Sequence, residues 1–324
     1  MIVAHNPVTS ADDPSTRDVL AQVAWVVDGL RALEIEHRVM AVDGRAVPPD
    51  GIPAIADAIV NLVESPPGEP VFQVTAAEAL TRLGLPCTGS GANAIRLTTD
   101  KLATRRRLAE VGVAVAAGGE FDPEDPRVLE AVPPPWILKP ALEDASLGLD
   151  DGAVTSDPIA AVRRARLLRD RFRQPVLVEH LLPGREFNLS LLEGPGGLEV
   201  LPPAEMLFVD FPSDRPRVLG WEAKWDETSF ASRHTVRRFL APGSEPALIA
   251  LLDATARAAW TATGVSGYAR VDLRLDEAGT PSVLEVNANP CLAADAGFVA
   301  AAAAAGLDAA AVVARLLESA GAHP

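Results

Sequence analysis

The sequence predicts an α/β protein that begins with a small parallel sheet covered by helices. Strand-like apolar runs and helix-like periodic runs alternate over the first hundred residues, which is typical of βαβ units. The predicted strands are residues 1–4, 38–42 and 58–63, and the predicted helices are residues 15–33 and 74–83. Gly84 directly follows the second helix, where a glycine commonly ends a helix.

Turn-forming residues at 85–93 mark the edge of this first region. Beyond them the same patterns predict four more helices, at 98–111, 158–172, 245–262 and 296–319. They also predict six strands, at 136–140, 176–180, 187–192, 198–201, 268–275 and 282–287, the last two forming a hairpin. The chain therefore continues as a mixture of α and β elements.

Composition narrows the possible functions. A length of 324 residues suggests two or three domains, and 48% hydrophobic residues exclude disorder for most of the chain. A net charge of −15 argues against nucleic acids and anionic membranes as partners. We find neither a signal peptide nor a transmembrane segment. Cys87 and Cys291 allow at most one disulfide, so we expect a cytoplasmic protein.

Lysine is rare in this chain. Only Lys101, Lys139 and Lys224 occur among 29 cationic residues. A flexible ammonium group suits phosphate oxygens deep in a cleft, whereas three lysines left by chance on the surface would have no role. The count alone leaves both interpretations open. The local sequence favours the first, because Lys101 lies in the first turns of a helix, Lys139 lies near a strand end before a glycine-containing loop, and Lys224 lies in WEAKW.

The predicted hairpin carries charged residues on one face. Its alternation puts Arg270, Asp272 and Arg274 on one strand beside Glu285 and Asn287 on the other. Asp272 and Glu285 should lie opposite each other and repel. A divalent cation such as Mg²⁺ would remove this repulsion, and the alternative is neutralisation by the two arginines. Zinc is disfavoured because no His or Cys cluster accompanies these residues. The other face is predicted to pack in the core through Val271, Leu273, Leu284 and Val286.

Five segments, taken in order, resemble the D-alanine–D-alanine ligase-like branch of the ATP-grasp superfamily. They are GLPCTGSGANAIRLTTDKLATRRRL, WILKPALEDASLG, VLVEHLLPGREF, WEAKW and GYARVDLRLDEAGTPSVLEVNANP. The resemblance implies an ATP-grasp fold with an N-terminal Rossmann-like domain over residues 1–95. It also implies a central subdomain over 96–182 and a C-terminal subdomain over 183–324.

The resemblance also implies roles for individual residues. Those implied to bind ATP are Lys101 and Lys139 at the phosphates, Glu179, His180 and Leu182 at adenine, and Glu186 at the ribose. Those implied to act in catalysis are Arg270, Lys224 from a loop that covers the site, and Ser146 in a loop that closes over the phosphates. Those implied to hold Mg²⁺, with Mn²⁺ as an alternative, are Asp272, Glu285 and Asn287.

The implied activity is that of an ATP-dependent ligase that joins a small-molecule carboxylate to an amine through an acyl phosphate. A homodimer is also implied. The chain departs from the family where the substrates should bind. Glu64 replaces a histidine, Glu69 lies near the family's glutamate, Cys291 replaces a glycine and Ala296 replaces a serine.

We therefore expect intact ATP chemistry with altered substrate selectivity. We expect Cys291 to be a small residue that lines the pocket, with a reactive thiol as the alternative. Two other functions stay open: a genuine D-alanine–D-alanine ligase, and an ATP-binding subunit without catalysis.

Overall fold

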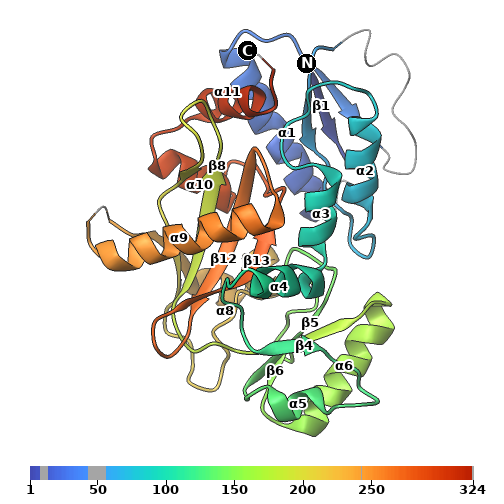
Figure 1. Ribbon diagram of the computed structural model, residues 1–324, viewed down its shortest axis with the longest axis vertical. Helices are drawn as coiled ribbons and strands as arrows, with labels where there is room; N and C mark the ends of the chain where they lie inside the picture. Colours follow the sequence, from blue (N-terminus) through green and yellow to red (C-terminus); the bar gives the residue numbers. More distant parts are fainter. Residues whose placement is uncertain (8–13, 43–55, 242, 323–324) are drawn as a thin grey trace.

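Three sheets follow one another along the long axis of the molecule (Figure 1). The computed structural model describes residues 1–7, 14–42, 56–241 and 243–322. A three-stranded sheet lies at one end, a six-stranded sheet in the middle and a four-stranded sheet at the other end. The mixture of α and β elements predicted from the sequence is confirmed, while the predicted domain boundaries remain predictions.

The first sheet is the predicted parallel one. Its central strand β1 (Ile2–His5) pairs in parallel with β2 (Arg38–Ala41) and β3 (Ile59–Leu62). All four residues of β1 and of β3 are buried, as is usual for parallel strands covered on both faces. The helices of this region are α1 (Pro14–Ala32) and α2 (Phe72–Thr81).

The four-stranded sheet has the order β4-β7-β5-β6. These strands are β4 (Gly118–Glu120), β5 (Trp136–Pro140), β6 (Val154–Thr155) and β7 (Val176–His180). The helices of this region are α5 (Val128–Ala131) and α6 (Pro158–Phe172). Helix α6 places Ala161, Ala165 and Leu168 in a core with Leu138 and Val178 of the sheet. Its small residues allow the helix to lie close to the strands.

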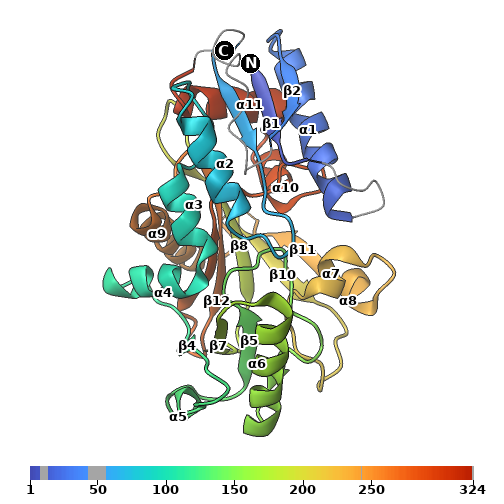
Figure 2. The same ribbon diagram turned by 90° about the vertical axis from the view of Figure 1, so that its right-hand side faces the viewer.

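The six-stranded sheet has the order β11-β10-β8-β12-β13, with β9 beside β8. Its strands are β8 (Glu186–Leu192), β9 (Glu199–Val200), β10 (Ala204–Phe208), β11 (Thr235–Phe239), β12 (Tyr268–Leu275) and β13 (Pro281–Asn287). Helix α9 (Pro246–Thr263) shares a core with β8, β12 and β13. Two short helices, α7 (Trp221–Trp225) and α8 (Phe230–His234), lie beside β10 and β11 (Figure 2).

The helix predicted over 98–111 is confirmed for residues 101–110, but its start is wrong, because a second helix ends just before Asp100. Helix α3 (Ala92–Thr99) ends before Asp100, whose extended backbone separates it from α4 (Lys101–Glu110). The Asp100 carboxylate accepts a hydrogen bond from the Ala103 amide at 2.9 Å and so caps α4. The cap makes Lys101 the first residue of α4.

The single helix predicted over 296–319 is also wrong. The structure has α10 (Gly297–Ala304) and α11 (Ala309–Ser319), which are bent by 104° relative to each other. Gly306 has a φ of +79°, and the Asp308 carboxylate caps α11.

In the part of the chain that the structure describes, no single helix has the length and apolarity to span a membrane. Helices α10 and α11 reach that length and apolarity only when they are counted together, across the bend between them.

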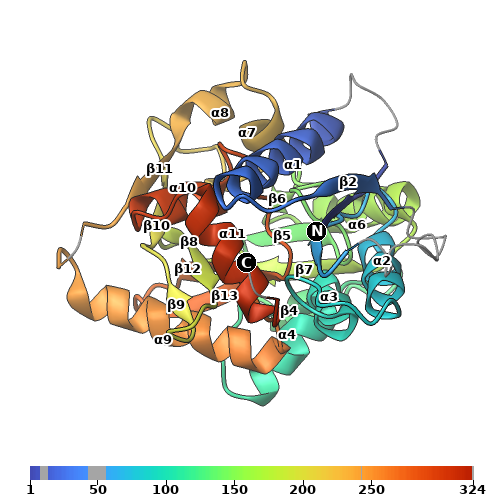
Figure 3. The ribbon, with the colours of Figure 1, turned by 90° about the horizontal axis from the view of Figure 1, so that it is seen from above.

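Helices α10 and α11 return to the N-terminal sheet (Figure 3). Val313 and Leu317 of α11 share a core with Val26 and Leu30 of α1. The two helices approach so closely that a Cβ atom at Gly29 would lie 2.7 Å from the Ala309 carbonyl oxygen. Segments from both ends of the chain therefore build one core.

Candidate functional site

A cavity of about 840 Å³ lies between the four-stranded and the six-stranded sheet. Thirteen of the sixteen residues predicted for the site line it: Lys101, Lys139, Ser146, Glu179, His180, Leu182, Glu186, Lys224, Arg270, Asp272, Glu285, Cys291 and Ala296. The other three, Glu64, Glu69 and Asn287, are not among its lining residues in the described part of the chain. The fold thus gathers all three lysines and both hairpin carboxylates around one space.

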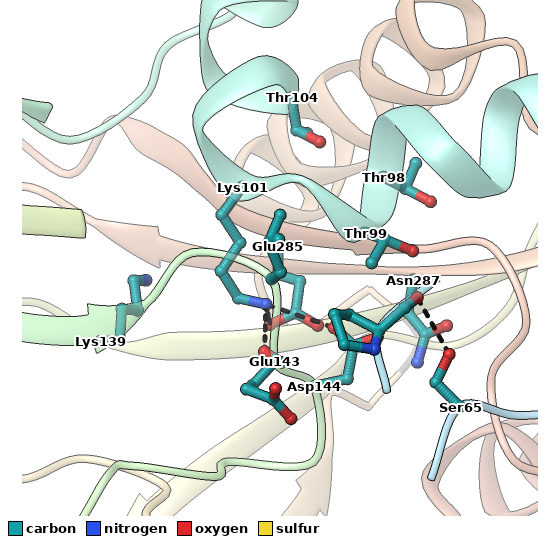
Figure 4. A network of polar contacts seen from close by, with 12 residues as sticks. Ser65, Thr98, Thr99, Lys101, Thr104, Lys139, Glu143, Asp144, Glu285 and Asn287 are labelled. Carbon is teal, nitrogen blue, oxygen red and sulfur yellow. Dashed lines mark hydrogen bonds and ion pairs between the residues drawn. The ribbon is translucent and has the colours of Figure 1, made fainter. Parts of the chain in front are cut away.

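Lys101 is buried at the start of α4 and surrounded by oxygen atoms (Figure 4). Its ammonium donates to the Glu143 carbonyl at 2.6 Å and to Asp144 Oδ1 at 3.2 Å, and it lies 4.0 Å from Glu285 Oε2. Burial alone would lower the pKa of Lys101, but the carboxylates of Glu285 and Asp144 raise it to about 12. Lys101 is therefore a fixed positive charge.

Lys139, on β5, is paired with Glu179 on the neighbouring strand β7. The Lys139 Nζ atom lies 2.5 Å from Glu179 Oε2. The other carboxylate oxygen, Oε1, accepts a hydrogen bond from Arg105 Nη1 at 2.5 Å. Sequence reasoning missed Arg105. Its spacing of four residues from Lys101 on α4, which puts both on one side of the helix, is the signal that could have found it.

The hairpin pairs as predicted up to one irregularity. Asp272 lies opposite Glu285, and Arg270 lies opposite Asn287. The register then shifts, so that Leu273 pairs with Val283 and Leu284 is the extra residue of a β-bulge. The prediction that Leu284 packs in the core is therefore wrong: Leu284 lines the cavity and Val283 takes its place in the core.

One of the two hairpin carboxylates is bound by arginine. Arg270 donates to both Asp272 oxygens, at 2.7 and 2.8 Å. Asn188 Nδ2 donates to Asp272 Oδ1 at 2.8 Å. Arg274 instead pairs with Glu186 at 3.1 Å, so neutralisation by both arginines does not hold.

Glu285 carries negative charge into the same space. Burial would raise the pKa of Glu285, but Lys101 and then Arg270 outweigh it and lower this pKa. The Asn287 side-chain oxygen accepts a hydrogen bond from the Asn289 amide at 2.9 Å. Asp272, Glu285 and Asn287 thus form a set of oxygen atoms at one end of the hairpin.

Two segments that border the cavity are bonded to each other. Ser146 Oγ donates to the Leu219 carbonyl at 3.0 Å, and Trp225 Nε1 donates to the Ala145 carbonyl at 3.0 Å. The loop predicted around Lys224 is in fact helix α7, with the Lys224 ammonium 5.2 Å from the centre of the Trp225 ring. The Ser146 loop and α7 therefore form one connected border.

One end of the cavity is lined by residues of α1 and of the segment before α10. Asp18 and Asp295 are there with Cys291, and sequence reasoning missed both aspartates, since no motif marks them. Burial raises the pKa of Asp18, and the Cys291 thiol is a hydrogen-bond partner of its carboxyl group. Burial also raises the pKa of Cys291, so the thiol stays protonated. A lining role fits this better than a reactive thiol does.

Glu64 lies next to this end of the cavity, near Asp18, and neither Glu64 nor Glu69 is among the described residues that line the wall. The Glu64 carboxylate accepts a hydrogen bond from Gln22 Nε2 at 3.1 Å. Burial, with the nearby charge of Asp18, raises the pKa of Glu64 to about 7. Glu69 is half-buried and its amide closes a turn on the Pro66 carbonyl.

Comparisons with known proteins agree with this geometry. Residues 122–318 match the family model described as the D-ala D-ala ligase C-terminus. The D-alanine–D-alanine ligase of Gluconobacter oxydans is 34% identical over 242 residues, which cover 73% of this chain and 72% of that protein. The uncharacterized protein y4sG of Sinorhizobium fredii is 31% identical over 268 residues, which cover 81% of this chain and 74% of that protein.

Solved structures show the same fold. The D-alanine–D-alanine ligase of Bacillus anthracis superposes with a TM-score of 0.75 at 19% identity, covering 98% of this chain and 96% of that one. A structure of the same enzyme complexed with ATP gives 0.73 at 18% identity, with the same coverage. The ATP-grasp fold predicted from the sequence is confirmed.

Proposed function

Because the chain belongs to the D-alanine–D-alanine ligase family of ADP-forming ATP-grasp ligases, we propose that it joins a small-molecule carboxylate to an amine. ATP is converted to ADP and phosphate, and a C–N bond forms through an acyl phosphate. One observation carries this proposal: three lysines and Arg270 line the same cavity as the Asp272 and Glu285 carboxylates.

ATP binds, in this proposal, along the side of the cavity formed by β5, β7 and α4. Lys101 and Lys139 bind the phosphates, with Lys224 of α7 as a third cation. Glu179, His180 and Leu182 contact adenine, and Glu186 takes the ribose hydroxyls. The support is that all seven residues line the cavity. The lysines offset the repulsion between ATP and an incoming carboxylate, which is the main requirement of phosphoryl transfer.

Asp272, Glu285 and Asn287 would hold Mg²⁺, with Mn²⁺ as an alternative. Two carboxylates facing each other across a hairpin and an amide oxygen are hard oxygen donors, which fit this type of ion. The Asn287 oxygen keeps a second lone pair beside its bond to the Asn289 amide. A bound Mg²⁺ supplies charge neutralisation at the phosphates.

Arg270 and the Ser146 loop serve the reaction itself. The substrate carboxylate attacks the γ-phosphate of ATP and ADP leaves; the amine then attacks the acyl carbon and phosphate leaves. The Arg270 guanidinium, inside the cavity, stabilises the negative charge that develops on the acyl phosphate. The loop and α7, bonded through Ser146 and Trp225, keep water from the acyl phosphate.

The substrates bind at the end of the cavity near α1 and α10. We assign the walls of the substrate-binding part of the cavity to Cys291, Ala296, Asp18 and Asp295. We assign Glu64 and Glu69 to the residues that support these walls from behind. This combination supports a selectivity different from that of D-alanine–D-alanine ligases. The matching family model favours a genuine D-alanine–D-alanine ligase as the second candidate. The homodimer and the cytoplasmic location remain predictions.

A phosphate-release assay tests the proposed function. The protein is incubated with ATP and Mg²⁺ and with pairs of amino acids, other carboxylates and amines, D-alanine included. We expect phosphate release that requires both a carboxylate and an amine. Release with D-alanine alone, together with the dipeptide, would establish the second candidate. ATP binding without turnover across the panel would instead indicate a non-catalytic subunit, and a protein that binds no ATP would refute the proposal.

A further inference from the structure

Arg105 connects three parts of the molecule behind the wall of the cavity. Its guanidinium donates to Glu179 Oε1 on β7 at 2.5 Å, to the Ala116 carbonyl at 2.8 Å and to the Gly118 carbonyl at 3.0 Å. Two main-chain acceptors and one carboxylate therefore hold it in place. Arg105 is not among the residues that line the large cavity in the described chain, so it acts there only through Glu179.

Glu179 is a buried carboxylate shared by two cations. Only 3% of the residue is exposed, and its second oxygen lies 2.5 Å from Lys139 Nζ. Removing one partner of a buried ion pair is costly because it leaves a charge without compensation. Glu179 is also paired with Arg105, so its charge remains compensated when Lys139 moves away.

The close packing of β4 on β7 keeps Arg105 from following Lys139. A Cβ atom at Gly118 would lie 2.3 Å from the Val178 carbonyl oxygen and 2.8 Å from the Glu179 Cα atom. The carbonyl groups that accept from Arg105 thus belong to a segment pressed directly against β7. Lys139, in contrast, lines the cavity and has a flexible stem, so its ammonium is the cation that is free to turn.

We propose that Arg105 is a positioning residue that releases Lys139 for ATP. In the structure the Lys139 ammonium is bound to Glu179. When it turns to a phosphate oxygen, Arg105 keeps the Glu179 charge compensated. Without Arg105, the departure of Lys139 would leave a bare carboxylate in the interior, and Lys139 would stay on Glu179. This inference rests on the proposed role of Lys139 in binding ATP.

Calorimetric titration of the full-length protein with ATP and Mg²⁺ tests the inference. We expect Arg105→Gln to raise the Kd for ATP about tenfold, because a charge-assisted pair becomes harder to break. Arg105→Lys retains the charge but loses the planar fork that also reaches the Ala116 and Gly118 carbonyls, so its Kd should lie between those of wild type and Arg105→Gln. The matched control is Arg106→Gln on the same helix, since Arg106 is exposed and has no ion pair among the described residues.

A second background separates this role from a structural one. With Glu179→Gln, no carboxylate holds Lys139, so adding Arg105→Gln should change the Kd for ATP by less than about threefold. A tenfold change in both backgrounds would mean that Arg105 only supports the fold, and the inference would be overturned. If Arg105→Gln alone does not fold, Glu179→Gln is compared with the double variant that carries both substitutions. A tenfold difference in Kd between these two proteins would still overturn the inference.

The proposed function and this inference fail in different ways. If wild type binds no ATP, or if Lys139→Ala leaves the Kd unchanged, the assignment of the phosphate site is wrong. If Lys139→Ala weakens binding while Arg105→Gln behaves like Arg106→Gln, only the inference about Arg105 is wrong.

Discussion

The two ends of the cavity are built differently. At the end formed by β5, β7 and β8, charged side chains on neighbouring strands are paired with opposite charges, as in Lys139 with Glu179 and Arg274 with Glu186. At the end near α1 and α10, Asp18 and Asp295 form no ion pair in the described part of the chain. Ion pairs between its own side chains order the first end, whereas the carboxyl groups of the second end are available to contact a substrate.

This difference suggests which part of the reaction each end controls. Side chains on adjacent strands are anchored at fixed points of the sheet, as is needed where the same nucleotide is always bound. Side chains on helix ends and connecting segments change without disturbing a sheet, so selectivity varies there at low cost to the fold. Four substitutions test this division, two at the ordered end and two at the other.

Lys139→Ala should have the largest effect. Loss of an ammonium group that meets the phosphates should lower kcat/KM roughly 1,000-fold, since such preorganised charge carries much of phosphoryl transfer. Phosphate release measures the effect and thermal unfolding monitors the fold. Arg163→Ala, a distant exposed residue of α6, is the control and should remain at wild-type activity. Normal turnover by Lys139→Ala would contradict the phosphate site.

Glu285→Gln should reduce activity roughly 100-fold, because one of the two facing carboxylates loses its charge at the proposed Mg²⁺ site. The Mg²⁺ concentration that gives half-maximal activity should also increase. Glu277→Gln, in the turn of the same hairpin, is the control for a lost surface carboxylate. An unchanged Mg²⁺ requirement in Glu285→Gln would argue against this residue as a metal ligand.

Asp18→Asn should affect the substrates and not the nucleotide. We expect KM for one of the two substrates to rise roughly tenfold, since a polar contact in a partly buried wall is lost, while KM for ATP stays unchanged. Asp28→Asn, which changes an exposed residue further along α1, is the control. An equal rise in both KM values would show that the two ends are not separate.

Glu64→Gln should have the smallest effect, on stability. Burial raises the pKa of Glu64 to about 7 in the folded protein, so folding favours the protonated carboxyl group. The contribution of Glu64 to the free energy of unfolding is most favourable below pH 4.5, the pKa of its carboxyl group in the unfolded chain. This contribution is lost as the pH rises through about 7. The free energy of unfolding of Glu64→Gln should therefore be about 1–3 kcal/mol higher than that of wild type at pH 8. The two proteins should differ little at pH 4. Urea unfolding at both pH values measures this, and an equal shift at both would exclude the titration of Glu64 as the cause.

Much of the ordered end could be predicted from the sequence. A strict alternation of side chains and a short turn were enough to pair Asp272 with Glu285, because strand geometry has a period of two residues. The bulge at Leu284 could not be predicted, since nothing in VLEVN marks an extra residue. The break at Asp100 was missed for a similar reason, because the helical pattern continues through it and only the cap reveals two helices.

The residues that sequence analysis missed depend on contacts between distant segments. Arg105 is one of three consecutive arginines; its spacing from Lys101 puts both on one side of α4, but only the fold reveals that its partner is Glu179 on β7. Asp18 looks like an ordinary residue of α1 until the segment around Cys291 meets it. Motifs within one segment are readable in a sequence, whereas partners brought together by the fold are not.

The joint core of α1 and α11 has a consequence for how the protein is made. Val26 and Leu30 are translated long before Val313 and Leu317, their partners in the same core. Contacts between positions so far apart form slowly, because a long loop must close first. The apolar face of α1 is thus left uncovered until α11 has been made, and molecular chaperones would have most reason to engage the nascent chain during that interval.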